Sequence, residues 1–176
     1  LHILKGFDPS DLKSIDHNAP IASGEDVKSG HVLVINDQGE FVLADSSTTG
    51  SGAHKGRTPY FAYADKTDTD VRASGLLPAL SSAGEYELET AFFDQTQNYT
   101  TDTKLTYGTG ANAGKLVPVS DITTSNDDIV GIVTRGGVTD LGRAAGFPVQ
   151  ENKAASDANG SVEVLTFVTN LMLSRQ

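Results

Sequence analysis

Three short apolar runs lie between Tyr99 and Val133, separated by stretches rich in glycine and polar residues. In the first run Leu105 and Tyr107 alternate with polar residues, the second run is KLVPV, and the third surrounds Gly131 with aliphatic residues. Short apolar runs bounded by turn-forming residues are typical of β-strands. We therefore predict three strands in this central part of the chain.

A hairpin is the clearest local signal in the sequence. The apolar runs HVLVI at 31–35 and EFVLA at 40–44 flank the loop NDQG at 36–39. Asparagine, aspartate and glycine accept the positive φ that such a loop requires. We therefore predict two strands joined by this loop.

A strand with one solvated face is predicted at 85–93, EYELETAFF. Tyr86, Leu88, Thr90 and Phe92 share one face of this strand, while glutamates occupy the other. Strict alternation of this kind indicates one face on a core and the other in water.

Two further segments predict strands with less regular patterns. PYFAYA at 59–64 places Phe61 and Tyr63 on one face, and proline is tolerated at the first position of a strand. The last apolar stretch, SVEVLTFVTNLML at 161–173, alternates at its start and predicts one or two strands.

The segment 71–80 is harder to assign because it contains both Gly75 and Pro78. We expect a polar loop at 65–70, followed by an irregular or bulged strand.

Counting all segments gives roughly eight to ten strands and no convincing helix of about ten residues or more. The predicted fold is all-β, a small β-barrel or sandwich with an extended N-terminal arm and long loops.

Residues 1–20 lack both the twofold and the 3.6-residue period and are therefore predicted to form the arm. The arm either lies on its own domain or docks on a neighbouring subunit, and the sequence leaves both open. Residues 21–176 are expected to form a single β domain. Burial against a partner subunit is expected for the apolar residues of the arm, which are Ile3, Leu4, Phe7, Leu12 and Ile15.

Two long connections separate the predicted strands. Residues 46–58 are rich in glycine, serine and threonine without apolar anchors, so we expect a mobile loop. Residues 135–160 contain few apolar residues and are too long for a tight turn.

Composition narrows the possible functions. The chain has 176 residues and no cysteine, which excludes disulfides, thiolate zinc sites and thiol nucleophiles. Its formal net charge of −10 would repel a phosphate backbone, so we expect no nucleic-acid partner. No run approaches the ~20 apolar residues that cross a bilayer, and the N-terminal stretch lacks the apolar segment of a secretory signal, so we expect a soluble chain without a membrane partner. The sequence begins at Leu1, which leaves open whether residues precede it.

One glycine-rich stretch imitates a phosphate-binding loop. The sequence GTGANAGKL at 108–116 nearly matches both a dinucleotide fingerprint and a loop ending in Gly114 and Lys115. Both motifs require a helix immediately afterwards, because its N-terminal amides hold the phosphate. KLVPV follows instead, so we predict a turn between two strands.

No other constellation indicates catalysis or a cofactor. The histidines, His2, His17, His31 and His54, lack the spacing of a metal site and are expected to be isolated surface residues. Aspartates cluster at Asp65, Asp68 and Asp70 and again at Asp127 and Asp128, but neither group follows a calcium-loop pattern. No G-x-S-x-G elbow occurs. We therefore expect no enzyme activity, no metal and no cofactor.

Two parts of the sequence, at 21–44 and 99–169, resemble the capsid decoration (cement) proteins of tailed bacteriophages. Residues 46–94 depart from the small members of that group and are interpreted as an insertion or as part of a larger subtype. The segments that carry the resemblance are SGEDVKSGHVLVINDQGEFVLA, DTKLTYG, GKLVPV and DDIVGIVT.

The resemblance implies a structural virion protein on the outer surface of the phage head. Such a protein binds the major capsid protein, commonly as a homotrimer, and stabilises the head by clamping neighbouring capsid subunits with an N-terminal arm. An alternative from another class is a phage fibre or receptor-binding β module that binds a host-surface glycan or protein. An enzyme on a β-barrel needs a carboxylate pair or a histidine-rich site, and the sequence indicates neither.

Overall fold

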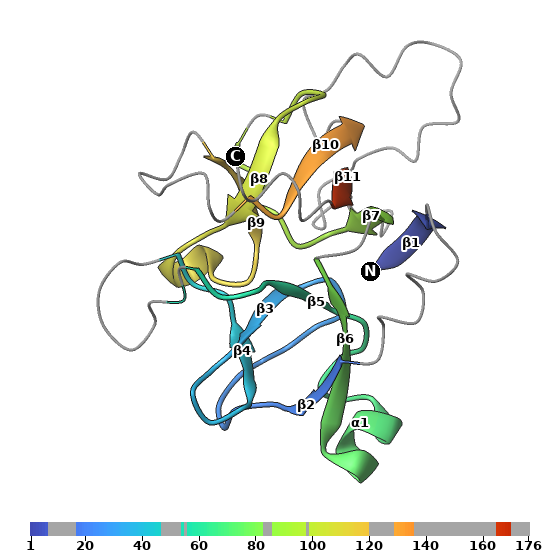
Figure 1. The fold of residues 1–176 in the computed structure, drawn as a ribbon, viewed down its shortest axis with the longest axis vertical. Helices are drawn as coiled ribbons and strands as arrows, with labels where there is room; N and C mark the ends of the chain where they lie inside the picture. Colours follow the sequence, from blue (N-terminus) through green and yellow to red (C-terminus); the bar gives the residue numbers. More distant parts are fainter. Residues whose placement is uncertain are drawn as a thin grey trace, which may run out of the picture.

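The computed structural model of the chain describes residues 1–6, 17–46, 54, 56–82, 86–97, 99–119, 129–135 and 165–169. These residues form two antiparallel sheets, and Figure 1 shows the larger sheet in the upper half of the molecule and the smaller sheet below it. The fold is therefore all-β and sandwich-like, as the sequence predicts. Most of the loop expected at 46–58 lies outside the described residues, and so does all of the segment 135–160 except residue 135.

The larger sheet has the strand order β1-β7-β11-β10-β8-β9. Its strands are β1 (His2–Gly6), β7 (Tyr86–Thr90), β8 (Lys104–Tyr107), β9 (Leu116–Pro118), β10 (Gly131–Arg135) and β11 (Leu165–Thr169). This sheet confirms the three strands predicted between Tyr99 and Val133, which lie side by side as β10, β8 and β9. It also confirms strands within 85–93 and 161–173.

The smaller sheet has the strand order β2-β6-β5-β3-β4. Its strands are β2 (His17–Pro20), β3 (Val32–Ile35), β4 (Phe41–Leu43), β5 (Tyr60–Ala62) and β6 (Leu76–Ser81). The predicted hairpin is β3 and β4, paired antiparallel. Its loop is stabilised by Asn36, whose side-chain oxygen accepts hydrogen bonds from the amides of Gln38 and Glu40, both at 2.9 Å.

The segment predicted as a polar loop and an irregular strand is organised differently. A helix of six residues, α1 (Thr69–Ser74), precedes the regular strand β6. The helix ends at Gly75, which adopts a left-handed conformation with φ 71° and donates its amide to the Val71 carbonyl. Pro78 is tolerated inside β6 because it lies just beyond the pairing with β5, which ends at Ala62. The amide hydrogen that proline lacks therefore interrupts no described strand pairing on the β5 side of β6. A helix this short carries too few turns to give a periodic signal.

Apolar side chains of the two sheets meet in an inter-sheet core. The strand β3 contributes Val32 and Val34 to it, whereas Leu33 points to the opposite face of the sheet. The run VLVI is continuous because both faces of β3 are buried. The other large, fully buried members of the inter-sheet core are Phe61, Leu80, Tyr86, Leu88, Tyr99, Leu105, Tyr107, Leu116 and Phe167.

The smaller sheet also encloses a second core on its other face. Leu33, Phe41 and Leu77 lie in this second core, together with Val71 of α1. The sheet curves so far that Ile21, directly after β2, forms a parallel bridge with Phe41 of β4. Within the described residues the two edges meet only at this bridge and do not form a closed ladder.

Strand β7 shows the alternation that the sequence predicts, but only as far as Thr90. Tyr86, Leu88 and Thr90 are buried and the glutamates between them are half-buried. The predicted continuation to Phe92 is wrong, because the strand ends at Thr90 and the neighbouring Phe93 is the buried aromatic residue instead.

We expect Gly131→Ala to destabilise the protein by about 1–3 kcal/mol, because the added methyl group overpacks the β10–β11 pairing. A Cβ at this position would lie 2.7 Å from the Val168 carbonyl oxygen and 2.7 Å from Cδ2 of Phe167. Urea unfolding measures the loss. The control is Lys104→Ala on the adjacent strand β8, where an exposed side chain is shortened and a change below about 0.5 kcal/mol is expected. Equal stabilities of the two variants would contradict this account of Gly131.

Candidate functional site

The edges of the sheets are the first candidates for a docking site, because an edge strand carries unpaired backbone groups that can bind another strand. The chain itself covers two of these edges. At β4, the Ala22 amide donates to the Phe41 carbonyl at 3.0 Å. At β9, Phe93 forms a parallel bridge with Leu116, and the Asp94 amide donates to the Leu116 carbonyl at 2.9 Å.

Strand β1 differs from these covered edges. It pairs with β7 on one side, and no strand in the described part of the chain pairs with its other side. The fourth edge strand, β2, leads directly into the bridge at Ile21. The outer side of β1 is therefore an edge at which a further strand could add without displacing a described one.

Parts of the segment predicted as an arm pair with strands of the same chain. The structure pairs β1 with β7 and β2 with β6 of the same chain, so these parts of residues 1–20 belong to the sheets. Strands of five and four residues show little alternation, and their partners lie far away in the sequence, so the pattern gave no strand signal. Among the predicted contact residues, Ile3 and Leu4 lie in β1, while Phe7, Leu12 and Ile15 lie outside the described residues. Contact of this segment with another subunit stays a prediction.

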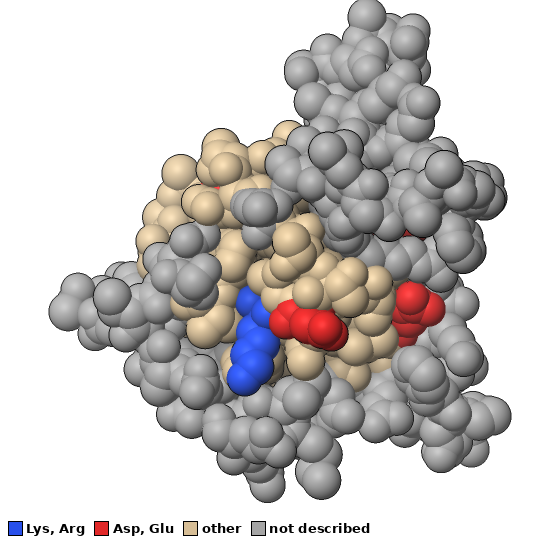
Figure 2. All heavy atoms as spheres, turned by 90° about the horizontal axis from the view of Figure 1, so that it is seen from above, with Lys and Arg blue, Asp and Glu red and all other residues tan. Residues whose placement is uncertain are grey.

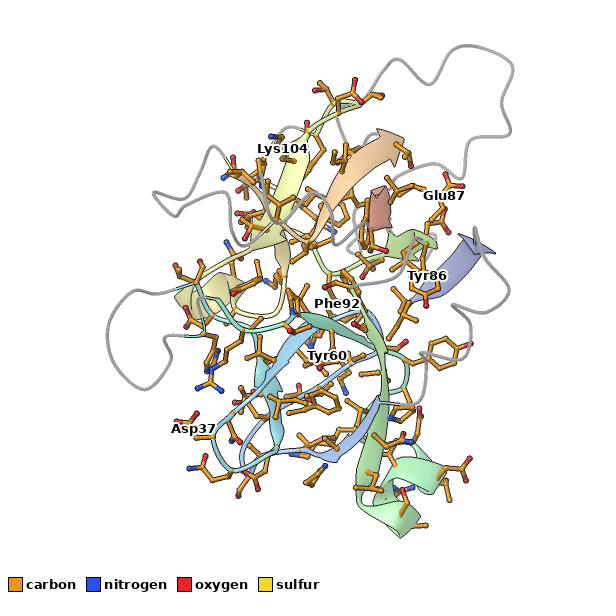
Figure 3. All side chains as sticks on the ribbon, viewed as in Figure 1. Asp37, Tyr60, Tyr86, Glu87, Phe92 and Lys104 are labelled. Carbon is orange, nitrogen blue, oxygen red and sulfur yellow. The ribbon has the colours of Figure 1, made fainter. Side chains whose placement is uncertain are left out.

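The outer face of β7 presents two carboxylates toward neighbouring strands. Glu87 accepts a hydrogen bond from the Thr134 hydroxyl at 3.3 Å, and Glu89 accepts one from the Thr166 hydroxyl at 3.4 Å. Figure 3 shows Glu87 and Tyr86 on opposite sides of β7. The glutamates are thus held in place by the strands on one side of β7, with β1 on its other side.

The register of β1 on β7 places Lys5 opposite Glu87 and His2 opposite Glu89. The register shifts between Ile3 and Lys5, which marks a bulge or irregularity in the strand.

The first residue of the chain lies against the inter-sheet core. The side chain of Leu1 packs on this core, and its amino group donates to the hydroxyl of Ser29 at 3.1 Å. Burial lowers the pKa of that amino group, although the carboxylates of Asp65 and Glu89 act in the opposite direction. These contacts anchor the start of β1 at the boundary between the two sheets.

A second candidate surface lies on the smaller sheet. Tyr63 is 45% exposed and Leu76 is 42% exposed. Tyr63 donates its amide to the Pro78 carbonyl at 3.0 Å, so both residues lie close to the same part of β6. The alternation in the sequence places Tyr63 on the same face as Phe61, which is fully buried. Nothing in the pattern indicates that Tyr63 itself is exposed.

A groove of about 440 Å³ adjoins this surface beside α1. Its apolar lining includes Val71, Leu76 and Pro78, and its polar lining includes Asp68 and Asp70. The groove could accept an apolar side chain of a partner.

In the view of Figure 2, most described atoms belong to uncharged residues, and basic and acidic side chains lie next to each other. The described part of this face therefore shows no large patch of charge of one sign.

Two histidines are buried, so the expectation of isolated surface histidines is wrong for them. His31 and His54 are each 8% exposed. The Nδ1 atom of His31 accepts a hydrogen bond from the Lys28 amide at 3.2 Å, and its ring packs edge-on against Phe92 with the centroids 3.9 Å apart. Figure 3 shows Phe92 between the two sheets. The side chains of His2 and His17 lie outside the described residues.

His54 has a comparable role in a different loop. Its Nδ1 atom accepts the Asp45 amide at 3.1 Å, and its carbonyl accepts the hydroxyl of Tyr107 at 3.1 Å. Burial lowers the pKa of His54, and the nearby Arg57 guanidinium lowers it further. Both buried histidines thus serve as neutral acceptors for backbone amides, a role that leaves no spacing signal in a sequence.

The glycine-rich stretch forms a turn, as predicted. A single 3₁₀ turn, η2 (Gly110–Asn112), is followed by β9, so no helix N-terminus is available to bind phosphate. Lys115 lies with its Nζ atom 3.5 Å from Oδ1 of Asn112. This geometry gives Lys115 a local contact within the turn.

In the first of the two aspartate clusters, the side chains of Asp65 and Asp68 contact backbone amides. Asp65 accepts the Ser29 amide at 2.7 Å, and Asp68 accepts the Asp65 amide at 3.0 Å. Asp127 and Asp128 lie outside the described residues. Over the described ranges, no group of three or more histidine, aspartate or glutamate side chains could hold a metal ion. In the same ranges, no helix has the length and apolar character to cross a membrane.

Comparison of the chain with models of known protein families, with characterised proteins and with solved structures gives no match. Inferences about function therefore depend on the sequence pattern and on the sites described above.

We expect His31 to make the fold sensitive to mild acid. Burial lowers its pKa from 6.5 to about 4, so the folded state favours the neutral ring. Its contribution to stability is complete above pH 6.5 and is lost as the pH falls toward 4, with a slope of up to about 1.4 kcal/mol per pH unit. Urea unfolding of the wild type and His31→Asn between pH 7.5 and pH 4 measures this slope.

The asparagine variant retains an acceptor for the Lys28 amide but does not titrate, so its stability should depend less on pH. Nuclear magnetic resonance gives an independent check. A His31 ring that titrates near its ordinary value in the folded protein would contradict the prediction.

Proposed function

We propose that this protein is a structural component of a tailed-bacteriophage virion that binds the outer surface of the head and stabilises it by clamping neighbouring capsid subunits. The proposal is supported by the resemblance of residues 21–44 and 99–169 to capsid decoration proteins. Strands β3, β4, β8, β9, β10 and β11 lie in these two parts of the chain. In this proposal the partner is the major capsid protein, and the protein acts as a homotrimer.

The observation that carries the proposal is the N-terminal edge strand. β1 presents its outer side without a strand partner among the described residues. A capsid segment added there would gain main-chain hydrogen bonds along the strand. Each contact is small, but a protein that binds many equivalent sites on a head, through several edge strands per assembly, gains strength from multivalency.

The alternative, a fibre or receptor-binding module that recognises a host-surface glycan or protein, fits the same all-β fold. The edge strand favours the head-binding proposal over recognition of a glycan, because strand addition requires a polypeptide partner. The two proposals differ in the target that the purified protein binds.

Co-sedimentation with expanded empty heads of the phage that carries this protein tests the proposal. We expect saturable binding of the full chain and at least a tenfold loss of affinity after deletion of residues 1–6, which removes about 1.4 kcal/mol or more of binding free energy. The matched control is Tyr63→Ser, which removes an exposed aromatic group from the other sheet and should bind as the wild type does. A thermal melt establishes that each variant is folded.

Two results would overturn the head-binding proposal. One is failure of the full chain to sediment with the heads, and the other is undiminished binding by the truncated chain. Binding to host cells but not to heads would support the receptor-binding alternative.

A further inference from the structure

We propose that the groove beside α1 is a docking site for a polypeptide segment in which an apolar side chain is flanked by lysine or arginine. Figure 1 shows α1 at the end of the smaller sheet that points away from the larger sheet. This inference goes beyond head binding and does not depend on it, because the groove and strand β1 belong to different sheets.

The floor of the groove continues the face on which the two sheets pack. Successive residues of a strand point to opposite faces, so Leu76, Pro78 and Leu80 of β6 share one face. Leu80 is fully buried in the inter-sheet core, Pro78 is half-buried, and Leu76 is 42% exposed. The inter-sheet packing thus covers one end of this apolar face, and the described chain leaves Leu76 at the other end open to a partner.

The wall of the groove is fixed by contacts within α1 and the turn that follows it. Val71 of α1 is buried in the second core, and its carbonyl accepts the Gly75 amide at 2.7 Å. The Ser74 hydroxyl donates to the Asp70 carbonyl at 2.8 Å, and its oxygen accepts the Leu76 amide at 3.2 Å. A site that is formed in advance loses little conformational entropy on binding.

The charges around the groove indicate the chemistry of the partner. Asp68 and Asp70 line the groove, and its described lining contains no lysine or arginine. The nearest basic residues along the chain are directed elsewhere, since Lys66 donates to the Glu25 carbonyl and the exposed Arg72 lies outside the lining. An acidic rim around an apolar floor favours a partner that carries cations beside an apolar group.

The size of the groove suits a single large side chain. Its volume of about 440 Å³ lies within the range of about 300–1,000 Å³ that is usual for ligand pockets. An apolar side chain placed there would cover Leu76 and remove apolar surface from water. Lysine or arginine on either side of it would lie near the two aspartates. Contacts between exposed charges are individually small, so we expect weak but saturable binding.

A titration with short synthetic peptides, followed by nuclear magnetic resonance, tests the site in the wild-type protein. The probe is a capped tripeptide of lysine, leucine and lysine. One matched control replaces the leucine with serine, and the other replaces both lysines with glutamate. We expect the probe to shift the amide signals of α1 and the start of β6 saturably, to leave those of β10 unchanged, and to bind at least about fivefold more tightly than either control.

Substitutions in the groove separate its apolar and charged contributions. Leu76→Ser removes the exposed apolar group and should weaken binding of the probe at least about threefold. Asp70→Asn removes a charge with little change of shape and should weaken binding about two- to threefold. The matched control is Asp26→Asn, an equal charge change at a side chain that is 82% exposed and lies outside the groove lining, and it should bind as the wild type does. A thermal melt establishes that each variant is folded.

Four results would overturn the proposal. The first is absence of saturable binding of the probe to the wild type, and the second is equal binding of the probe and either control peptide. The third is an equal effect of Asp26→Asn and Asp70→Asn, because attraction to the acidic chain as a whole would then explain the binding. The fourth is self-association of the wild type that Leu76→Ser abolishes in sedimentation equilibrium, because a second copy would then occupy the groove. None of these measurements involves phage heads, so their outcome is independent of the co-sedimentation result.

Discussion

Packing between the two sheets is the interaction on which the rest of this structure depends. The described strands have only three to six residues, so neither sheet offers a large apolar face by itself. Tyr86, Tyr107 and Phe167 from the larger sheet meet Phe61 from the smaller sheet in the inter-sheet core. Burying each such side chain is worth roughly 1.5–3 kcal/mol, and the chain has no disulfide to replace that contribution.

The hydroxyl groups of two tyrosines in this core form hydrogen bonds with backbone carbonyls. The Tyr107 hydroxyl donates to the carbonyl of His54, and the Tyr99 hydroxyl donates to the carbonyls of Asp94 and Leu116. A buried hydroxyl without a partner would cost about 1–3 kcal/mol, so the loops that carry these carbonyls are held against the core. The same principle explains the buried histidines, whose ring nitrogens accept amides that would otherwise be unpaired.

The sequence predicts the fold best where the signal is local. The β3–β4 hairpin follows from its turn residues, and β7 follows from the alternation of Glu87 and Glu89 with buried residues. The helix α1 escapes prediction because six residues do not establish a period, and Gly75 and Pro78 suggest an interrupted strand. The predicted total of roughly eight to ten strands falls below the eleven in the described residues, mainly because β1 and β2 lie in a segment interpreted as an arm.

The sequence predicts only part of the candidate site, because the pairing of distant segments leaves no local signal. Ile3 and Leu4 can be identified as apolar residues in a polar context, but their pairing with β7 joins positions more than eighty residues apart. The sequence alone does not show that Lys5 lies opposite Glu87, because that position follows from the register of the two strands. Long-range pairing of this kind depends on closing a large loop and leaves no periodic pattern in either segment.

The edge strand combines two opposing requirements. An open edge invites any strand to add, and proteins limit this hazard with short edge strands, lysines and bulges. β1 has all three features, since it has five residues, contains Lys5 and shows a register shift beside it. These features limit indiscriminate pairing along its outer side, whereas a partner strand that fits the irregular edge can still add there through main-chain hydrogen bonds.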